Sequence, residues 1–89
     1  MASVRLDGML RQFTPKLSVD VSASDVRGML DELEQSYPRL KFRIRDETGA
    51  VRRFVRIFVN GEEITALNGL ATPLNGADHI DILHSIQGG

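Results

Sequence analysis

The sequence contains no cysteine and no tryptophan, and only 3 of its 89 residues are proline. Because cysteine is missing, the chain can form no disulfide and offers no thiolate for catalysis or zinc binding, and nothing argues for secretion. No apolar run approaches the roughly 20 residues of a membrane span, and residues 1–10 lack the apolar core of a signal peptide. We therefore expect a cytoplasmic protein.

What is present fits one small globular domain. The chain is 42% hydrophobic and 26% charged, without repeats or low-complexity stretches. A domain of this size buries a little over about 60% of the surface of its unfolded chain, so we expect modest stability.

Basic residues are concentrated in one part of a nearly neutral chain. The formal net charge is −1, yet seven of the eleven Lys and Arg residues lie between Arg39 and Arg56. Such a run is most often a solvated face of the fold. It is also the kind of surface that binds an acidic protein or a nucleic acid.

The segment that ends at Pro38 predicts the one long helix of the chain. Ser22 or Ser24 can cap its first turn, and Asp25 suits the positive end of the helix dipole. Pro38 disfavours helical geometry in the residue before it and so ends the helix. The apolar stripe consists of Val26, Met29, Leu30, Leu33 and Tyr37.

Alternation of apolar and polar residues predicts strands at residues 3–6, 17–21, 51–59 and 79–83. Asn60-Gly61 is the preferred pair for a two-residue hairpin turn, with residues 62–64 as a short return strand. Residues 39–45 also alternate, which favours a strand but leaves a short irregular segment open. Residues 67–79 predict a loop. The first and last strands would be central neighbours in a mixed sheet.

Three motifs give these elements a family resemblance: RFVRIFVNGEEI at residues 53–64, GLATPLNGADHIDIL at residues 69–83, and the terminal Gly88-Gly89. The chain resembles the sulfur carriers of the ThiS/MoaD family, and most of all the CysO type of cysteine biosynthesis. The resemblance implies an α+β, ubiquitin-like β-grasp fold with a mixed sheet of four to five strands and one main helix on one face. It implies a domain over residues 1–84 and a flexible tail over residues 85–89.

The resemblance also implies a chemistry for Gly89. In this family an E1-like (MoeB/ThiF-type) enzyme uses ATP and Mg to adenylate the terminal carboxylate, which a sulfur donor converts to a thiocarboxylate. The thiocarboxylate then supplies sulfide to an acceptor such as a PLP-dependent cysteine synthase or a thiazole, molybdopterin or thiosugar enzyme. The chain itself would be a monomeric co-substrate with no bound cofactor, not an enzyme. A protease that releases an extended carrier is a further implied partner.

Many relatives have a small or proline-containing run where this chain reads HSIQGG, so pathway and acceptor stay open. Gly88, Gln87 and Ile86 would thread a narrow channel in the partner, which favours glycine because it has no Cβ. We expect Ile86 to fill a partner pocket, although it could instead lie on its own domain. The alternative for the whole tail is a frayed end without a role.

A docking patch is predicted on the sheet. If Val55, Ile57 and Val59 face the core, then Phe54, Arg56 and Phe58 face away from it. Leu83 should emerge on the same face as Phe58. Exposed aromatic side chains suggest a partner surface; the alternative is that Phe54 or Phe58 packs under the loop after Asn68.

His79 and His84 lie five residues apart without a third ligand candidate nearby, so we expect surface histidines and no metal site. Asp81 should be solvated. No catalytic triad, phosphate loop or carboxylate pair stands out.

Two other functions compete with sulfur transfer. A ubiquitin-like modifier would use the same adenylate at Gly89 but transfer the acyl group to lysine. A β-grasp interaction module would bind RNA or an acidic protein through residues 39–56, with an idle tail, and would do so in a salt-sensitive way. We rank this third reading last, so nucleic acid is not the expected partner.

Overall fold

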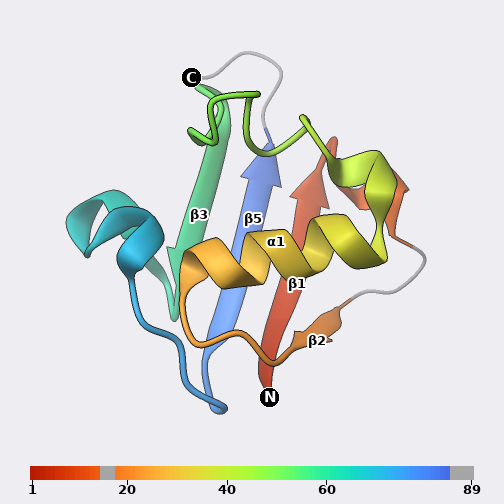
Figure 1. Ribbon diagram of the computed structural model, residues 1–89. Coiled ribbons are helices and arrows are strands. Elements are labelled where there is room, and N and C mark those ends of the chain that lie inside the picture. Colours follow the sequence, from red (N-terminus) through yellow and green to blue (C-terminus); the bar gives the residue numbers. More distant parts are fainter. Residues whose placement is uncertain (15–17, 85–89) are drawn as a thin grey trace.

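The computed structural model describes residues 1–14 and 18–84 (Figure 1). Over these residues one α-helix, α1 (Val26–Ser36), accompanies a five-stranded sheet. The strands are β1 (Ala2–Gly8), β2 (Val19–Val21), β3 (Val55–Val59), β4 (Glu62–Glu63) and β5 (His79–His84). Four short 3-10 helices connect them: η1 (Arg11–Phe13), η2 (Pro38–Leu40), η3 (Ile64–Ala66) and η4 (Gly69–Ala71).

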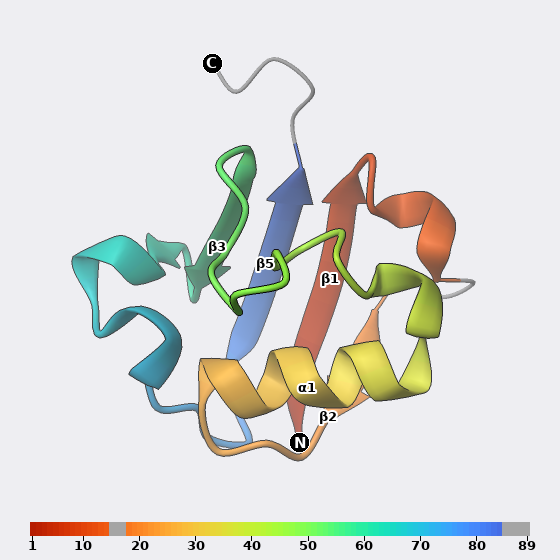
Figure 2. The same ribbon diagram turned by 45° about the horizontal axis from the view of Figure 1, so that its top comes forward.

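The sheet has the order β2-β1-β5-β3-β4, with β1 and β5 parallel and the other pairs antiparallel. The first and last strands are therefore central neighbours, as predicted. Figure 2 shows α1 as a single layer in front of the sheet. This arrangement confirms the α+β, β-grasp architecture. The predicted strand at residues 17–21 is shorter in the structure, and Leu17 lies outside the described residues.

The core lies between α1 and the sheet because both elements turn an apolar face inward. Val26, Met29, Leu30 and Leu33 are buried in α1, in the predicted stripe. In the sheet, Ile82 pairs with Leu6 on one side and with Ile57 on the other. All three side chains are buried, so neighbouring strands place their apolar residues side by side.

The helix cap differs from the expected one. The carboxylate of Asp25 accepts a hydrogen bond of 2.7 Å from the amide of Gly28, so Asp25 is the N-cap and the prediction of Ser22 or Ser24 is wrong. The backbone amide of Ser22 instead donates to Glu32 at 3.0 Å. The sequence analysis gave Asp25 only a role at the helix dipole, and the structure makes it the cap as well. The helix ends at Ser36, before Pro38, as predicted.

The segment after α1 is not a strand, so the irregular alternative for residues 39–45 holds. η2 begins at Pro38, and the alternation fails at Phe42, which is 50% exposed and has a φ of 66°. Leu40 and Ile44 are fully buried on either side of it. Arg45 fixes the far end of the segment on α1.

The contacts of Arg45 explain how that anchor works. Its Nη2 lies 2.8 Å from Asp31 and 3.1 Å from Glu34, and its side chain is only 11% exposed. Burial disfavours the charged guanidinium, but the hydrogen bonds to Glu34 and Asp31 outweigh that effect and raise the pKa of Arg45.

The loop between η3 and β5 is joined to the start of α1. The amide of Val26 donates to the carbonyl of Thr72 at 3.0 Å, and the amide of Leu74 donates to the carbonyl of Ser24 at 2.8 Å. Leu74 is buried, which the sequence analysis did not predict. The hairpin at Asn60-Gly61 is confirmed: both residues have positive φ, and Val59 pairs with Glu62.

The carboxylate of Asp78 closes this loop and gives a pH-dependent prediction. It accepts hydrogen bonds of 2.9 Å from the Asn75 amide and from Nδ2 of Asn60, which lower the pKa of Asp78 below 3.8. Because the folded-state pKa is depressed, the stabilisation is present above about pH 4 and is lost as the pH falls through the folded pKa. We expect a carboxyl NMR titration to place the Asp78 midpoint below 3.8.

In an Asn60→Ala protein the Asp78 midpoint should move upward, because one of the two hydrogen bonds is gone. Asp46 is the internal control, since its pKa is lowered by hydrogen bonds from Thr48 that this substitution does not touch. A wild-type Asp78 midpoint at or above 3.8 would contradict the hydrogen-bond assignment.

Candidate functional site

The last described residue, His84, lies at the end of the central strand. β5 is held there on both sides, since His84 pairs with Gly8 of β1 and with Val55 of β3. The amide of Met9 also donates to the carbonyl of His84 at 3.3 Å. We call His84, Gly8 and Val55 the tail root. The fold thus fixes the point from which the predicted tail would leave the domain.

The predicted tail residues lie outside the described residues. These are Ile86, Gln87, Gly88 and Gly89, within the segment 85–89. The boundary at residue 84 and the flexibility of the tail therefore stay predictions.

Gly8 is required at the tail root by its backbone and by its surroundings. Its φ is 65°, in the left-handed region that side chains disfavour. A Cβ at this position would also overlap the carbonyl oxygen of His84 and lie 3.1 Å from Cδ1 of Leu83. Gly8 could not be identified from the sequence, because a close approach between two strands leaves no local signature.

His84 is not a surface histidine, so that prediction is wrong. Along β5 it lies on the same side of the sheet as the buried Ile80 and Ile82, and it is itself half buried. Its Nδ1 is buried and has no hydrogen-bond partner among the described residues. The period-two pattern of β5 could have indicated this. The ring borders a hollow of about 60 Å³ that is also lined by Met9, Leu10, Gln12, Phe13 and Arg43.

The predicted docking residues come together on the face of the sheet opposite α1. Arg56 pairs directly with Leu83, and Phe58 pairs with Asp81, so all four lie on one face. Leu83 is 38% exposed and Phe58 is half buried. Phe54 lies just before β3 and is also half buried.

Charged contacts surround these docking residues. The Arg53 guanidinium lies 5.3 Å from the centre of the Phe54 ring. Arg56 makes an ion pair of 3.2 Å with Glu63. In the loop after β4, Leu67 and Leu70 pack against the core beside the buried Leu74. A docking role for Phe54, Arg56, Phe58 and Leu83 stays a prediction.

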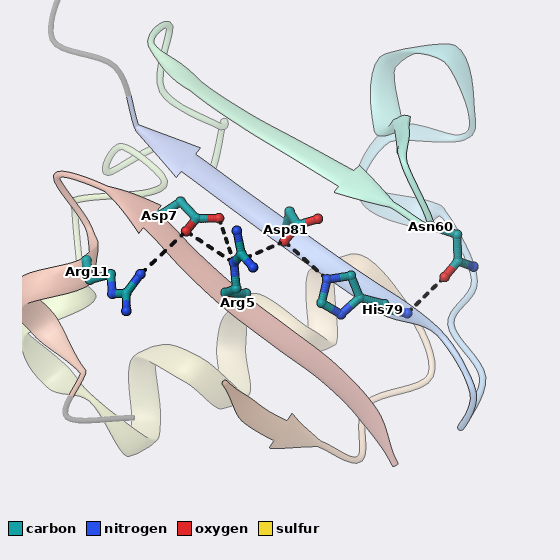
Figure 3. A network of polar contacts seen from close by, with 6 residues as sticks. All are labelled: Arg5, Asp7, Arg11, Asn60, His79 and Asp81. Atoms are coloured by element: carbon teal, nitrogen blue, oxygen red, sulfur yellow. Dashed lines mark hydrogen bonds and ion pairs between the residues drawn. The ribbon is translucent and has the colours of Figure 1, made fainter. Parts of the chain in front are cut away.

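Charged residues on β1 and β5 border this patch, because Asp7 pairs with Leu83 and Asp81 pairs with Phe58. Figure 3 shows the contacts among these charged residues. Nε of Arg5 lies 3.1 Å from Asp7 and 3.8 Å from Asp81. Asp81 is also 3.2 Å from Nε2 of the exposed His79, and Asp7 is 3.9 Å from Arg11. Asp81 is thus paired as well as partly solvated. The sequence could not show this network, because it depends on the parallel pairing of Arg5 with Asp81.

These contacts form a network of ion pairs on the open face of the sheet. Each carboxylate of the network faces a cation, and exposed ion pairs of this kind contribute little stability. Within residues 1–14 and 18–84, no group of three His, Cys, Asp or Glu side chains is arranged to hold a metal ion. In the same ranges, no helix is long and apolar enough to cross a membrane.

Three comparisons with known proteins show which family this chain is similar to. The sequence model of the ThiS family matches residues 4–89. The sulfur carrier protein CysO of Mycobacterium tuberculosis is 32% identical over 90 residues, covering 98% of this chain and 97% of that protein. The small archaeal modifier protein 1 of Methanosarcina acetivorans superposes with a TM-score of 0.89 at 30% identity, covering 99% of this chain and 95% of that one.

The CysO chain in the Amycolatopsis orientalis BexX/CysO complex superposes with a TM-score of 0.88 at 27% identity and full coverage of both chains. The sequence matches and the structural matches both cover nearly the whole chain. The structural neighbours have the ubiquitin-like β-grasp fold, which confirms the predicted fold. This chain belongs to the ThiS family.

Proposed function

We propose that this protein is a sulfur carrier whose reactive group is the carboxylate of Gly89. The observation that carries the proposal is that the ThiS-family match continues to Gly89, five residues beyond the central strand of the sheet. The similar CysO protein is itself named a sulfur carrier. The fixed tail root supports the proposal, because a rigid domain can present a short tail to another protein.

The proposed chemistry has two steps. An E1-like adenylating enzyme binds ATP and Mg, and the Gly89 carboxylate attacks the α-phosphorus of ATP, which releases pyrophosphate. The resulting acyl-adenylate is a mixed anhydride with a good leaving group. A sulfide nucleophile attacks its acyl carbon, AMP leaves, and a thiocarboxylate remains on Gly89. This chain is then the co-substrate of other enzymes, and the proposed location of the reaction is the cytoplasm.

The acceptor in this proposal is a biosynthetic enzyme. A CysO chain occurs in a complex with another protein, BexX, which supports a second partner for the carrier besides the activating enzyme. The candidates are a PLP-dependent cysteine synthase and a thiosugar or thiazole synthase. A processing protease is a further candidate partner, and a monomer suits a carrier that must fit several enzymes.

The experiment that tests this function is an intact mass measurement. The protein is incubated with ATP, Mg, sulfide and the E1-like enzyme of the same organism. We expect a gain equal to the replacement of one oxygen by sulfur, located at Gly89, and no gain in a protein that lacks Gly89. An unchanged mass for the wild type would contradict the proposal.

A second candidate function is protein modification. It is favoured by the similarity to a small archaeal modifier protein, with a TM-score of 0.89. Both functions share the adenylate and differ in the nucleophile, which is sulfide in one and a lysine amine in the other. Peptide mapping of cell extracts would separate them, because only a modifier leaves the Gly89 carbonyl joined to a lysine.

The predicted docking patch gives a test of recognition. We expect Leu83→Asp to weaken binding to the activating enzyme about tenfold, because it places a charge in an apolar contact. Because Leu83 pairs with Asp7 and is only 38% exposed, the new carboxylate also costs some stability, so binding is measured well below the unfolding temperature of the variant. Ala77→Asp is the matched control, an exposed loop position before β5 that gains the same charge. Equal affinity of both variants, measured by calorimetry, would remove Leu83 from the interface.

A further inference from the structure

The seven Lys and Arg residues between Arg39 and Arg56 fall into two groups in the structure. Arg45 and Arg56 have carboxylate partners and hold the chain to α1 and β4. The other five cations form no ion pair with any carboxylate of the described residues, although all are exposed. They are Arg39, Lys41, Arg43, Arg52 and Arg53. Arg52 also lies near enough to the Asp46 carboxylate to lower its pKa. Ion pairing therefore does not explain why these five charges are clustered.

The five cations lie at the same end of the sheet as the tail root. Val55 pairs with His84, so Arg53 is two residues from that pair. Arg43 and His84 line the same hollow. Figure 1 shows the segment between η2 and β3, drawn in green, at the end of the sheet toward which β1 and β5 point.

Aromatic rings hold several of these cations in place. The guanidinium carbons of Arg39 and Arg43 lie 5.4 and 5.2 Å from the centre of the Phe13 ring. Lys41 lies 5.5 Å from the Phe42 ring. At these distances each cation is attracted by the ring face while it keeps contact with solvent. The charges are thus positioned without being neutralised.

Phe42 is a further sign that this surface has a role besides folding. Its φ of 66° is costly for a residue with a side chain, and its ring is 50% exposed, so its burial does not offset that cost. The Nε of Arg52 donates a hydrogen bond of 2.6 Å to the Phe42 carbonyl and so keeps this conformation. An exposed ring among arginines is a typical composition of a protein interface.

We propose that Arg39, Lys41, Arg43, Arg52 and Arg53 form a basic collar around the tail root that docks on an acidic surface of the enzyme that activates the tail. The inference rests on the proposed function, because it requires the tail to enter that enzyme. A surface next to the tail root must approach the rim of the partner site, and uncompensated positive charge there fits carboxylates.

An acidic protein fits this collar better than a nucleic acid does. Single-stranded nucleic acids bind basic surfaces by stacking bases on open aromatic faces. Here the rings of Phe13, Phe42 and Phe54 already have cations over them. The collar would steer association with the enzyme over a range of about 10 Å, which salt shortens.

The test uses ATP–pyrophosphate exchange by the E1-like adenylating enzyme, titrated with the full-length carrier at several salt concentrations. We expect Arg43→Glu and Arg53→Glu to raise the KM for the carrier about tenfold, with kcat within about twofold of the wild type. The wild-type KM should rise with salt more steeply than the KM of either variant. Arg27→Glu, an exposed position on α1, is the matched control and should behave as the wild type.

The outcomes separate the collar from the proposed function. An unchanged KM and salt dependence in both collar variants, with normal exchange by the wild type, would overturn the collar alone. Absence of exchange with the wild type would count against the proposed function. In that case equal binding of wild type and Arg43→Glu to the enzyme, measured by calorimetry, would overturn the collar too. Binding of poly(U) RNA that Arg43→Glu abolishes, with an unchanged KM, would assign the surface to nucleic acid instead.

Discussion

Replacement of Gly8 by alanine should lower the free energy of unfolding by about 3 kcal/mol. Two effects add up at this position. A residue with a Cβ loses about 1–2 kcal/mol in the left-handed region, which a φ of 65° requires. The new methyl group also overlaps the carbonyl oxygen of His84, and such overpacking costs about 1–3 kcal/mol. Urea denaturation followed by circular dichroism measures the sum.

Gly69→Ala is the matched control for Gly8→Ala. Gly69 has a similar φ of 57°, but nothing lies within 4 Å of the added Cβ. It should therefore show only the backbone effect, about 1–2 kcal/mol. If the two substitutions destabilise the protein equally, the backbones of β1 and β5 do not approach each other closely at Gly8. A larger loss at Gly8 would show that the tail root depends on contact between two backbones.

Gly88→Val should lower the rate of thiocarboxylate formation on the order of 100-fold, because a misplaced reacting group loses rate steeply. The proposed channel of the activating enzyme admits a backbone without side chains, and a branched side chain at residue 88 would hold the Gly89 carboxylate away from ATP. The unfolding transition should stay that of the wild type, since the substitution lies beyond His84. Single-turnover mass spectrometry measures the rate.

Ser85→Val controls for the added bulk and branching, because it changes the same tail nearer to the domain. We expect it to react at nearly the wild-type rate. If Gly88→Val reacts equally fast, the tail does not pass through a narrow channel, and the expected role of Gly88 would have to be given up.

Patterns with a strong local cause were predictable from the sequence. The stripe from Val26 to Leu33 and the hairpin at Asn60-Gly61 both follow from short-range geometry, and both are confirmed. The period of two along β3 and β5 also placed Arg56, Phe58 and Leu83 on one face. Their role in docking remains to be tested.

Features that depend on tertiary contacts were not predictable. The alternation of residues 39–45 indicated a strand, but the burial of Leu40 and Ile44 and the anchor at Arg45 impose an irregular path. The close approach at Gly8 arises only when β1 and β5 come together. The predicted reactive end, residues 85–89, has a chemical role suggested by family resemblance rather than by any described contact.

In the proposed function, the terminal carboxylate of Gly89 is the group that attacks ATP. The most direct test compares the wild-type protein with a semisynthetic protein that ends in a Gly89 carboxamide, which has the same sequence but cannot form an acyl-adenylate. ATP–pyrophosphate exchange by the E1-like enzyme should occur with the carboxylate form and be absent with the carboxamide form. Equal exchange with both forms would contradict the claim, because the carboxylate would then not be the group that attacks ATP.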